Sequence, residues 1–315
     1  GAPVPLGADA VVMQEEVTVV DDSHVRFQTL PTSGQCIRKK GEDIEKDIVL
    51  LHKGTRLDPA SLGLAASIGL SSLAVFDRPK VALFSTGDEL VMPGDIEPHL
   101  LPSGSIFNSN RFFLRSLLER LGCEVTDLGN VPDDPEQTVA ALSHAATNHD
   151  LILTSGGVSV GEADFVKPAV QALGELQLWS LSIKPGKPFA YGHIKNQTSQ
   201  DKQAHFIGLP GNPVSSLVTF LMLVRPFILS LQGCLDVTVK PALERADFSF
   251  PKADRRREFL RVKRNQHGGL DLFPNQSSGV LTSAVWADGL VDNPAGTIIA
   301  TGDKVNFLSF KDLMS

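Results

Sequence analysis

The feature that most constrains the fold is a series of short apolar runs that alternate with helical patterns between residues 78 and 232. Apolar runs such as Lys80–Ser85 and Asp150–Thr154 are typical of strands that are buried on both faces. One helical pattern begins near Asn110, and another follows the helix-capping residues Asp133-Asp134-Pro135. Strands that alternate with helices predict βαβ units and a three-layer α/β domain with a mainly parallel sheet.

The regions on either side predict two smaller parts. Residues 1–77 combine β-branched runs with a helix that begins at Asp58-Pro59, so they predict a β-rich N-terminal module. Residues 233–315 alternate apolar and polar residues and predict a small β-barrel or sandwich. The runs that support these predictions are Val11–Met13, Val17–Val20, Glu258–Val262 and Lys304–Phe310. We therefore expect a multidomain α/β plus β protein with domains at 1–77, 78–232 and 233–315.

Charge and cysteine content exclude several classes of function. The chain has 29 Lys+Arg against 36 Asp+Glu, a net charge of −7, which argues against nucleic acid or an anionic membrane as a partner. Three cysteines without a CxxC pair predict a reducing, cytoplasmic setting. The apolar run Val214–Val224 is followed directly by Arg225 and Pro226, so we predict no membrane span. The chain opens on Gly1, and we expect it to be trimmed at its N-terminus.

Four loops rich in glycine or proline follow predicted strands, which is where open parallel sheets bind their ligands. These loops are Ser85–Glu89, Thr154–Gly161, Lys184–Pro188 and Leu209–Pro213. Each one alone can be an ordinary turn or helix start, but four at one sheet edge favour a shared anion site. The candidate cofactor-binding residues in them are Thr86, Gly87, Asp88, Ser155, Gly156, Gly157, Ser159, Lys187, Pro210, Gly211, Asn212 and Pro213.

The same loops lack the motifs of several other enzyme classes. The glycines of Gly156–Gly161 are not spaced as in a dinucleotide GxGxxG, and no GK[ST] follows them as in a P-loop. No GxSxG elbow of a serine hydrolase is present. The eight histidines show neither HxH nor HExxH spacing, so a zinc enzyme has no support.

Charged residues near these loops suit a phosphorylated ligand and a hard cation. The acids Asp43, Asp88, Glu89, Asp133 and Asp164 offer the carboxylate oxygens that Mg²⁺ prefers, although each can equally be a cap or a surface charge. Asp133 in particular also fits the N-cap of the helix that follows it.

Basic residues provide two further candidate contacts for an anion. Lys184 and Lys187 bracket Pro185-Gly186 and either point into one site or form a solvated turn. Residues 252–264 hold seven basic residues against two acidic ones, a pattern that suits an oxyanion but also an exposed hairpin face.

Taken in order, the motifs resemble those of the MoeA family of molybdopterin molybdenumtransferases, which is related to the E domain of gephyrin. The resemblance covers nearly the whole chain and is strongest over residues 80–220. It rests on Gly7–Val12, Gly41–Asp43, Ser85–Leu90, Thr154–Gly161, Lys184–Pro188 and Leu209–Ser215. It implies a central MogA-like domain and the insertion of molybdate into adenylylated molybdopterin, with release of AMP and with Mg²⁺ as cofactor.

The resemblance also implies roles for individual residues. The implied catalytic residues are Glu89, Asp164, Asp43, Asp133 and Lys184, and Glu89 and Asp164 are the implied metal ligands. In the C-terminal domain, Arg261 and Ser278 join the cofactor-binding set. The family further implies a homodimer and contact with the molybdopterin adenylyltransferase and other proteins of the pathway.

Two departures from the family affect the expected site. Ser180 stands where the family can have a further lysine, and the family's N-terminal Asp-Asn-Ser-Ala-Met-Asp-Gly-Tyr-Ala motif has no match. Two alternatives stay open. One is a MogA-like or CinA-like nucleotide-processing enzyme, although those families have Thr-Gly-Gly-Thr-Gly or Gly-Gly-Leu-Gly-Pro where this chain has Gly-Gly-Val-Ser-Val-Gly. The other is a gephyrin-like scaffold without catalysis.

Overall fold

A computed structural model describes residues 1–158, 165–199 and 202–315. The chain forms two compact units, one of residues 1–53 and 57–70 and the other of residues 54–56 and 71–315.

The first unit has less strand than its sequence predicts. Strands β1 (Val17–Asp21) and β2 (His24–Phe27) form an antiparallel hairpin. Helix α1 (Pro59–Ser67) begins as predicted, because the Asp58 side chain accepts a hydrogen bond from the Ser61 N–H at 2.7 Å. The prediction of a strand at Val11–Met13 is wrong, since the Val11 N–H donates to a loop carbonyl and not to a neighbouring strand.

In the second unit, a six-stranded sheet has the order β6-β3-β7-β11-β10-β8. Its strands are β3 (Lys80–Thr86), β6 (Glu124–Val131), β7 (Leu151–Ser155), β8 (Gly174–Ser180), β10 (Pro188–Lys195) and β11 (Gln203–Leu209). The first four strands in that order are parallel, which confirms the mainly parallel sheet. Strand β10 is antiparallel to both of its neighbours, and the sequence did not predict it. Two short strands that follow β3 in the chain, β4 (Leu90–Val91) and β5 (Ile106–Phe107), pair in parallel with each other.

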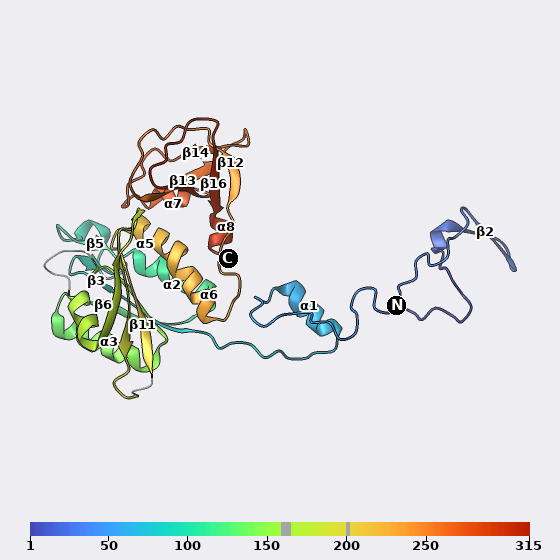
Figure 1. Ribbon diagram of the computed structural model, residues 1–315, viewed down its shortest axis with the longest axis horizontal. Helices are drawn as coiled ribbons and strands as arrows, with labels where there is room; N and C mark the ends of the chain where they lie inside the picture. The colour runs from blue at the N-terminus through green and yellow to red at the C-terminus, as the bar shows by residue number, and fades with distance from the viewer. Residues whose placement is uncertain (159–164, 200–201) are drawn as a thin grey trace. The chain divides into compact units, whose positions relative to one another are not determined.

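Helices cover both faces of this sheet (Figure 1). They are α2 (Asn110–Arg120), α3 (Pro135–Asn148), α4 (Val166–Leu173), α5 (Pro213–Thr219) and α6 (Arg225–Leu231), with a π-helical turn at Phe220–Val224 between the last two. Leu83 and Leu153 pack toward α2 and α5, whereas Phe84 and Ile152 pack toward α3 and α4. Strands β3 and β7 are mostly apolar because both of their faces are buried.

The helical stretch Pro213–Leu231 is long and apolar enough to cross a membrane by length and composition alone. However, 67% of its most apolar window is buried inside the fold. A core helix passes the same test, so this stretch is weak support for a membrane span.

The C-terminal part of the second unit is a small β domain, as predicted. Its sheet has the antiparallel order β12-β16-β15-β13-β14, and β9 pairs in parallel with β13. The elements are β9 (Ile183–Lys184), β12 (Ala242–Arg245), β13 (Arg257–Arg264), β14 (Leu270–Leu272), α7 (Thr282–Trp286), β15 (Gly289–Asn293), β16 (Lys304–Ser309) and α8 (Phe310–Leu313). Phe259 and Leu290 join the core around α5, and Leu260 and Val291 form a second core on the opposite face.

The central position of β7 leads to a stability prediction. Leu153 is fully buried, so Leu153→Ala should lower the free energy of unfolding by about 2–5 kcal/mol through lost apolar contact and a residual cavity. Leu243→Ala on β12 is the control, because Leu243 is 69% exposed and should change stability little. Urea denaturation measures both, and equal losses would contradict the assigned core.

Candidate functional site

A cavity of about 710 Å³ lies at the carboxyl ends of β3, β7 and β11. It is the place where ligand sites occur in parallel sheets of this kind. The predicted residues that line it are Thr86, Gly87, Glu89, Asp133, Ser155, Gly156, Gly157, Pro210, Gly211, Asn212 and Pro213. Three of the four predicted loops therefore meet at one cavity, and Pro188 of the fourth also lines it.

The loops after β3, β7 and β11 are in direct backbone contact. The Gly156 N–H donates to the Leu209 carbonyl oxygen at 3.0 Å. Gly156 has a φ of +94°, and a Cβ there would lie 2.6 Å from the Thr86 carbonyl oxygen. Glycine is required at this position on both counts, because a side chain would strain the backbone and push the loops apart.

Asn110, at the start of α2, links two of these loops and was missed as a site residue. Its side-chain amide donates to Ser155 Oγ at 2.8 Å and to the Gly211 carbonyl oxygen at 2.7 Å. The sequence indicated only a helix start here. A buried amide at the first turn of a helix is the signal that could have identified it.

Asn108 is a second polar residue of the cavity wall that the sequence did not single out. It is 2% exposed, and its Oδ1 accepts a hydrogen bond from the Arg111 N–H at 3.2 Å. Its Nδ2, like the hydroxyl of Thr86, has no hydrogen-bond partner within the described part of the chain. Buried polar atoms normally have a partner, so these two groups are available to a ligand or to bound water.

Asp88 and Asp133 join the loops after β3 and β6. The Asp133 N–H donates to Asp88 Oδ1 at 3.1 Å, and the Asp88 N–H donates to Asp133 Oδ2 at 3.4 Å. The helix cap is Asp134, which accepts from the Gln137 N–H at 2.8 Å, so the N-cap interpretation of Asp133 is wrong. Burial raises the pKa of Asp133, and the negative charges of Asp88 and Glu89 raise it further against the opposing hydrogen bond from Asp88.

Two carboxylates on the cavity wall, those of Glu89 and Asp133, suit a hard cation. Glu89 folds over Gly87, where a Cβ would lie 2.6 Å from its carboxylate oxygen. Among residues 1–158, 165–199 and 202–315, no three His, Cys, Asp or Glu side chains are grouped to hold a metal ion. The two carboxylates of Glu89 and Asp133 are a donor set of the kind that fits Mg²⁺, which proteins bind by one or two carboxylates.

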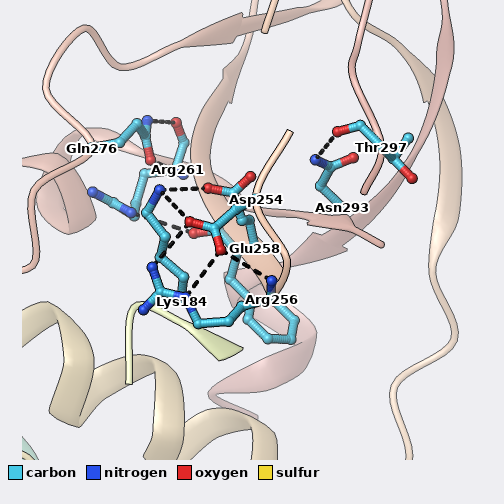
Figure 2. Close-up of polar contacts among 9 residues, drawn as sticks. Lys184, Asp254, Arg256, Glu258, Arg261, Gln276, Asn293 and Thr297 are labelled. Carbon is cyan, nitrogen blue, oxygen red and sulfur yellow. Dashed lines mark hydrogen bonds and ion pairs between the residues drawn. The ribbon is translucent and has the colours of Figure 1, made fainter. Parts of the chain in front are cut away.

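The two lysines of the Lys184–Pro188 loop have different surroundings. Lys184 Nζ lies 2.9 Å from Glu258 Oε1 and 3.2 Å from Asp254 Oδ2 (Figure 2). Lys187 is exposed and forms no ion pair with a described residue. Lys184 is therefore held by two carboxylates, and Lys187 is not among the residues that line the cavity, so its contact with an anion stays a prediction.

Arg261 is 1% exposed and lies behind the cavity wall. Its guanidinium donates to Ser283 Oγ at 3.1 Å and to the Ser277 carbonyl oxygen at 3.2 Å, and burial lowers its pKa to about 10. The next residues continue this link, because the Ser278 carbonyl accepts from the Val214 N–H at 2.9 Å and Gly279 lines the cavity. Arg261 and Ser278 thus hold a loop of the wall by backbone contacts.

The basic cluster of residues 252–264 is partly neutralised. Three of its arginines pair with carboxylates, and the pairs are Arg256–Asp254, Arg257–Asp292 and Arg264–Glu244. Two of these acids come from other strands, so a local count of charge could not include them.

Three predicted residues stay outside this description of the cavity. Asp43 lies in the first unit. Ser159 and Asp164 lie outside the described residues, so their assignments stay predictions.

The raised pKa of Asp133 has a consequence for stability. A carboxyl whose pKa is higher in the folded state costs stability above that pKa, so Asp133→Asn should raise the melting temperature at pH 7. The gain should shrink as the pH falls through the folded-state pKa and vanish below about 3, where the carboxyl is protonated in both states. Asp134→Ala is the matched control and should instead lose about 1 kcal/mol by removing the helix cap. A lower melting temperature for Asp133→Asn at pH 7 would contradict the assignment.

Comparison with known proteins agrees with this architecture. The model of the MoeA N-terminal region (domain I and II) matches residues 1–69, that of a probable molybdopterin binding domain matches residues 82–230, and that of the MoeA C-terminal region (domain IV) matches residues 245–310. The chain is similar to a crystal structure of the molybdopterin biosynthesis MoeA protein from Pyrococcus horikoshii OT3, with a TM-score of 0.80, 26% identity and coverage of 98% of this chain and 74% of that one.

Two relatives carry the name molybdopterin molybdenumtransferase. The one from Haemophilus influenzae is 49% identical over 233 residues, which are 74% of this chain and 55% of that protein. The one from Synechococcus elongatus is 36% identical over 312 residues, which are 98% of this chain and 74% of that protein. The chain thus spans just over half of the first relative's length and about three quarters of the second's. Identity and coverage at this level show that the chain belongs to the MoeA family of molybdopterin molybdenumtransferases, proteins of molybdenum cofactor biosynthesis.

Proposed function

We propose that the protein inserts molybdate into adenylylated molybdopterin and releases AMP. The observation that carries this proposal is the convergence of a Ser-Gly-Gly loop and two carboxylates, Glu89 and Asp133, on one cavity. The names of the relatives support the same reaction. A cavity of about 710 Å³ has the size of a site for a small organic ligand.

The loop after β7 is the proposed phosphate site. Its glycines bring backbone N–H groups to the cavity wall without side chains in the way. Ser155 adds a hydroxyl, which Asn110 holds in place. Asn212 and the buried amide of Asn108, which also line the cavity, offer further donors to phosphate oxygens or to the pterin.

Glu89 and Asp133 would hold Mg²⁺, with Asp164 as the expected additional ligand. When bound, Mg²⁺ supplies charge neutralisation at the phosphoanhydride. The protein's own part is to present two carboxylates, and the pKa of Asp133 is raised mainly by burial, with repulsion from the negative charges of Asp88 and Glu89 added to it. A cation relieves that repulsion, so the acids favour binding of a metal together with an anionic substrate.

Positive charge comes from two sources in this proposal. Lys187, which is exposed and directly precedes cavity-lining Pro188, is the proposed contact to an oxyanion. Arg261 contributes a fixed buried charge behind the wall. Both favour the phosphates and the molybdate dianion, and neither suits a nucleic acid polymer in a protein of net charge −7.

We extend the proposal to the assembly and its setting. In this proposal the protein is a homodimer, and Asp43 is one of its catalytic residues. The substrate comes from the molybdopterin adenylyltransferase. The three cysteines, which are unpaired, suit a reducing cytoplasm.

The function is tested by AMP release from adenylylated molybdopterin in the presence of molybdate and Mg²⁺. Glu89→Gln should lower kcat by about 100-fold or more, because loss of a carboxylate next to the reacting phosphates removes electrostatic stabilisation. Glu136→Gln, an exposed residue of the neighbouring helix α3, is the matched control and should retain activity.

The assay also separates the alternatives. Release of AMP without molybdate would favour a nucleotide-processing enzyme over a molybdenumtransferase. Absence of AMP release under all conditions, with binding intact, would favour a scaffold.

A further inference from the structure

The buried side chain of Asn110 joins two loops of the cavity wall that come from different strands. Asn110 lies at the first turn of α2, lines the cavity and is 7% exposed. Its Nδ2 atom donates to the hydroxyl oxygen of Ser155, at the end of β7, at 2.8 Å and to the carbonyl oxygen of Gly211, after β11, at 2.7 Å. Both hydrogens of the amide nitrogen are therefore used, one for each loop.

The Gly211 carbonyl determines which way the amide of Asn110 faces. A carbonyl oxygen can only accept a hydrogen bond, so the atom that faces it is the amide nitrogen. Rotation of the amide by half a turn would bring the Asn110 Oδ1 atom against the Gly211 carbonyl oxygen, so that two acceptors would face each other. The Ser155 oxygen consequently meets an N–H group and accepts its hydrogen.

This contact limits what the Ser155 hydroxyl can do. A serine hydroxyl has one hydrogen to donate and can also accept hydrogen bonds. Asn110 supplies the hydrogen that the Ser155 oxygen accepts, and the hydrogen of the hydroxyl has no acceptor among the described residues. Ser155 is 3% exposed and lines the cavity. Because a buried hydroxyl normally donates its hydrogen, its acceptor is expected in the cavity.

We propose that Asn110 is a positioning residue that commits the Ser155 hydroxyl to donate its hydrogen to a phosphate oxygen of the substrate. A deprotonated phosphate oxygen is a strong acceptor, so a donor that is already oriented toward it favours its binding. The inference rests on the proposed function, because this phosphate belongs to the adenylyl group of the substrate and remains on the product AMP.

Two neighbouring side chains of the wall have a similar preference. The Oδ1 atom of Asn108 accepts from the Arg111 N–H, so the group that Asn108 leaves without a partner is the donor Nδ2. The Thr86 hydroxyl also has no partner among the described residues, and a Cβ on Gly157 would lie 2.7 Å from its oxygen. The wall around the Ser-Gly-Gly loop therefore has hydrogens to donate, which suits a ligand group that is rich in acceptor oxygens.

The experiment is a double-mutant cycle of Asn110→Ala and Ser155→Ala in which calorimetry measures the affinity for AMP. Ser155→Ala should weaken AMP binding by about tenfold, the ratio expected for the loss of one hydrogen bond to a charged group. In the wild-type background, Asn110→Ala should weaken it by about three- to tenfold, because the hydroxyl is then free to turn away. In the Ser155→Ala background the same substitution should weaken it by less than about twofold, since it acts through that hydroxyl.

Adenosine provides a second measurement because it lacks the phosphate. Neither substitution should change the affinity for adenosine. A purely structural role of Asn110 would weaken both ligands by the same factor, whereas a role through a phosphate contact weakens AMP alone.

Asn196→Ala is the matched control. Asn196 is likewise 7% exposed, and its Nδ2 atom donates to the Thr147 carbonyl oxygen at 3.1 Å. It lies between β10 and β11, at the edge of the sheet opposite to the carboxyl end of β11 that faces the cavity. The substitution should lower the melting temperature, as Asn110→Ala does, and should leave the affinity for AMP unchanged.

A second variant covers the case in which Asn110→Ala does not fold. Asn110→Asp is nearly isosteric, and its carboxylate accepts the Ser155 hydrogen in place of the phosphate. It should weaken AMP binding in the wild-type background and should do so by a smaller factor in the Ser155→Ala background.

Three results overturn the inference: an unchanged affinity for AMP in the Asn110 variant, an equal loss in the two backgrounds, or an equal loss for adenosine. If the wild-type protein does not bind AMP, the proposed function fails and the inference fails with it. Binding of AMP by the wild type without an effect of Asn110 removes the inference alone.

Discussion

The rest of the structure depends on the parallel alignment of β6, β3, β7 and β11. Because these strands run in one direction, the chain leaves the sheet at the same edge four times, and the loops that follow are brought together. Burial of both faces by helices fixes the strand positions, so the loops share a rigid base. Residues as distant in sequence as Thr86 and Asn212 line one cavity for this reason.

The parts that the sequence predicts correctly are those whose cause is local. The apolar runs of β3 and β7 reflect burial on both faces, and helix α3 begins where its capping residues predict. The glycines predict the loops correctly because their cause is also local: the close backbone contact between Gly156 and Thr86 leaves no room for a side chain. Most of the cavity wall could therefore be predicted from loop motifs and the direction of the strands.

The parts that the sequence does not predict depend on partners elsewhere in the chain. Strand β10 contains Gly192 and begins at Pro188, so its sequence is not typical of a strand. It pairs antiparallel with β8 and β11, whereas the local pattern predicts parallel βαβ units. Two arginines of β13, Arg257 and Arg264, are neutralised by acids of β15 and β12, and a local count of charge does not include those acids. Asn110 looks like an ordinary helix residue in the sequence, because its hydrogen-bond acceptors, Ser155 and Gly211, lie far away in the chain. In each case the deciding contact is long-range.

The two most buried charged residues of the C-terminal domain, Glu258 and Arg261, have different kinds of partner. The difference bears on how this domain supports the cavity wall. The negative charge of Glu258 is compensated by Lys184 at the junction between β9 and β13. Arg261 is solvated by a hydroxyl and backbone carbonyls and has no carboxylate partner among the described residues, so its charge is not cancelled nearby. A buried cation of this kind is costly, and its hydrogen bonds offset part of that cost. Because one of those bonds goes to the Ser277 carbonyl, two residues before cavity-lining Gly279, Arg261 fixes the segment that leads into the cavity wall.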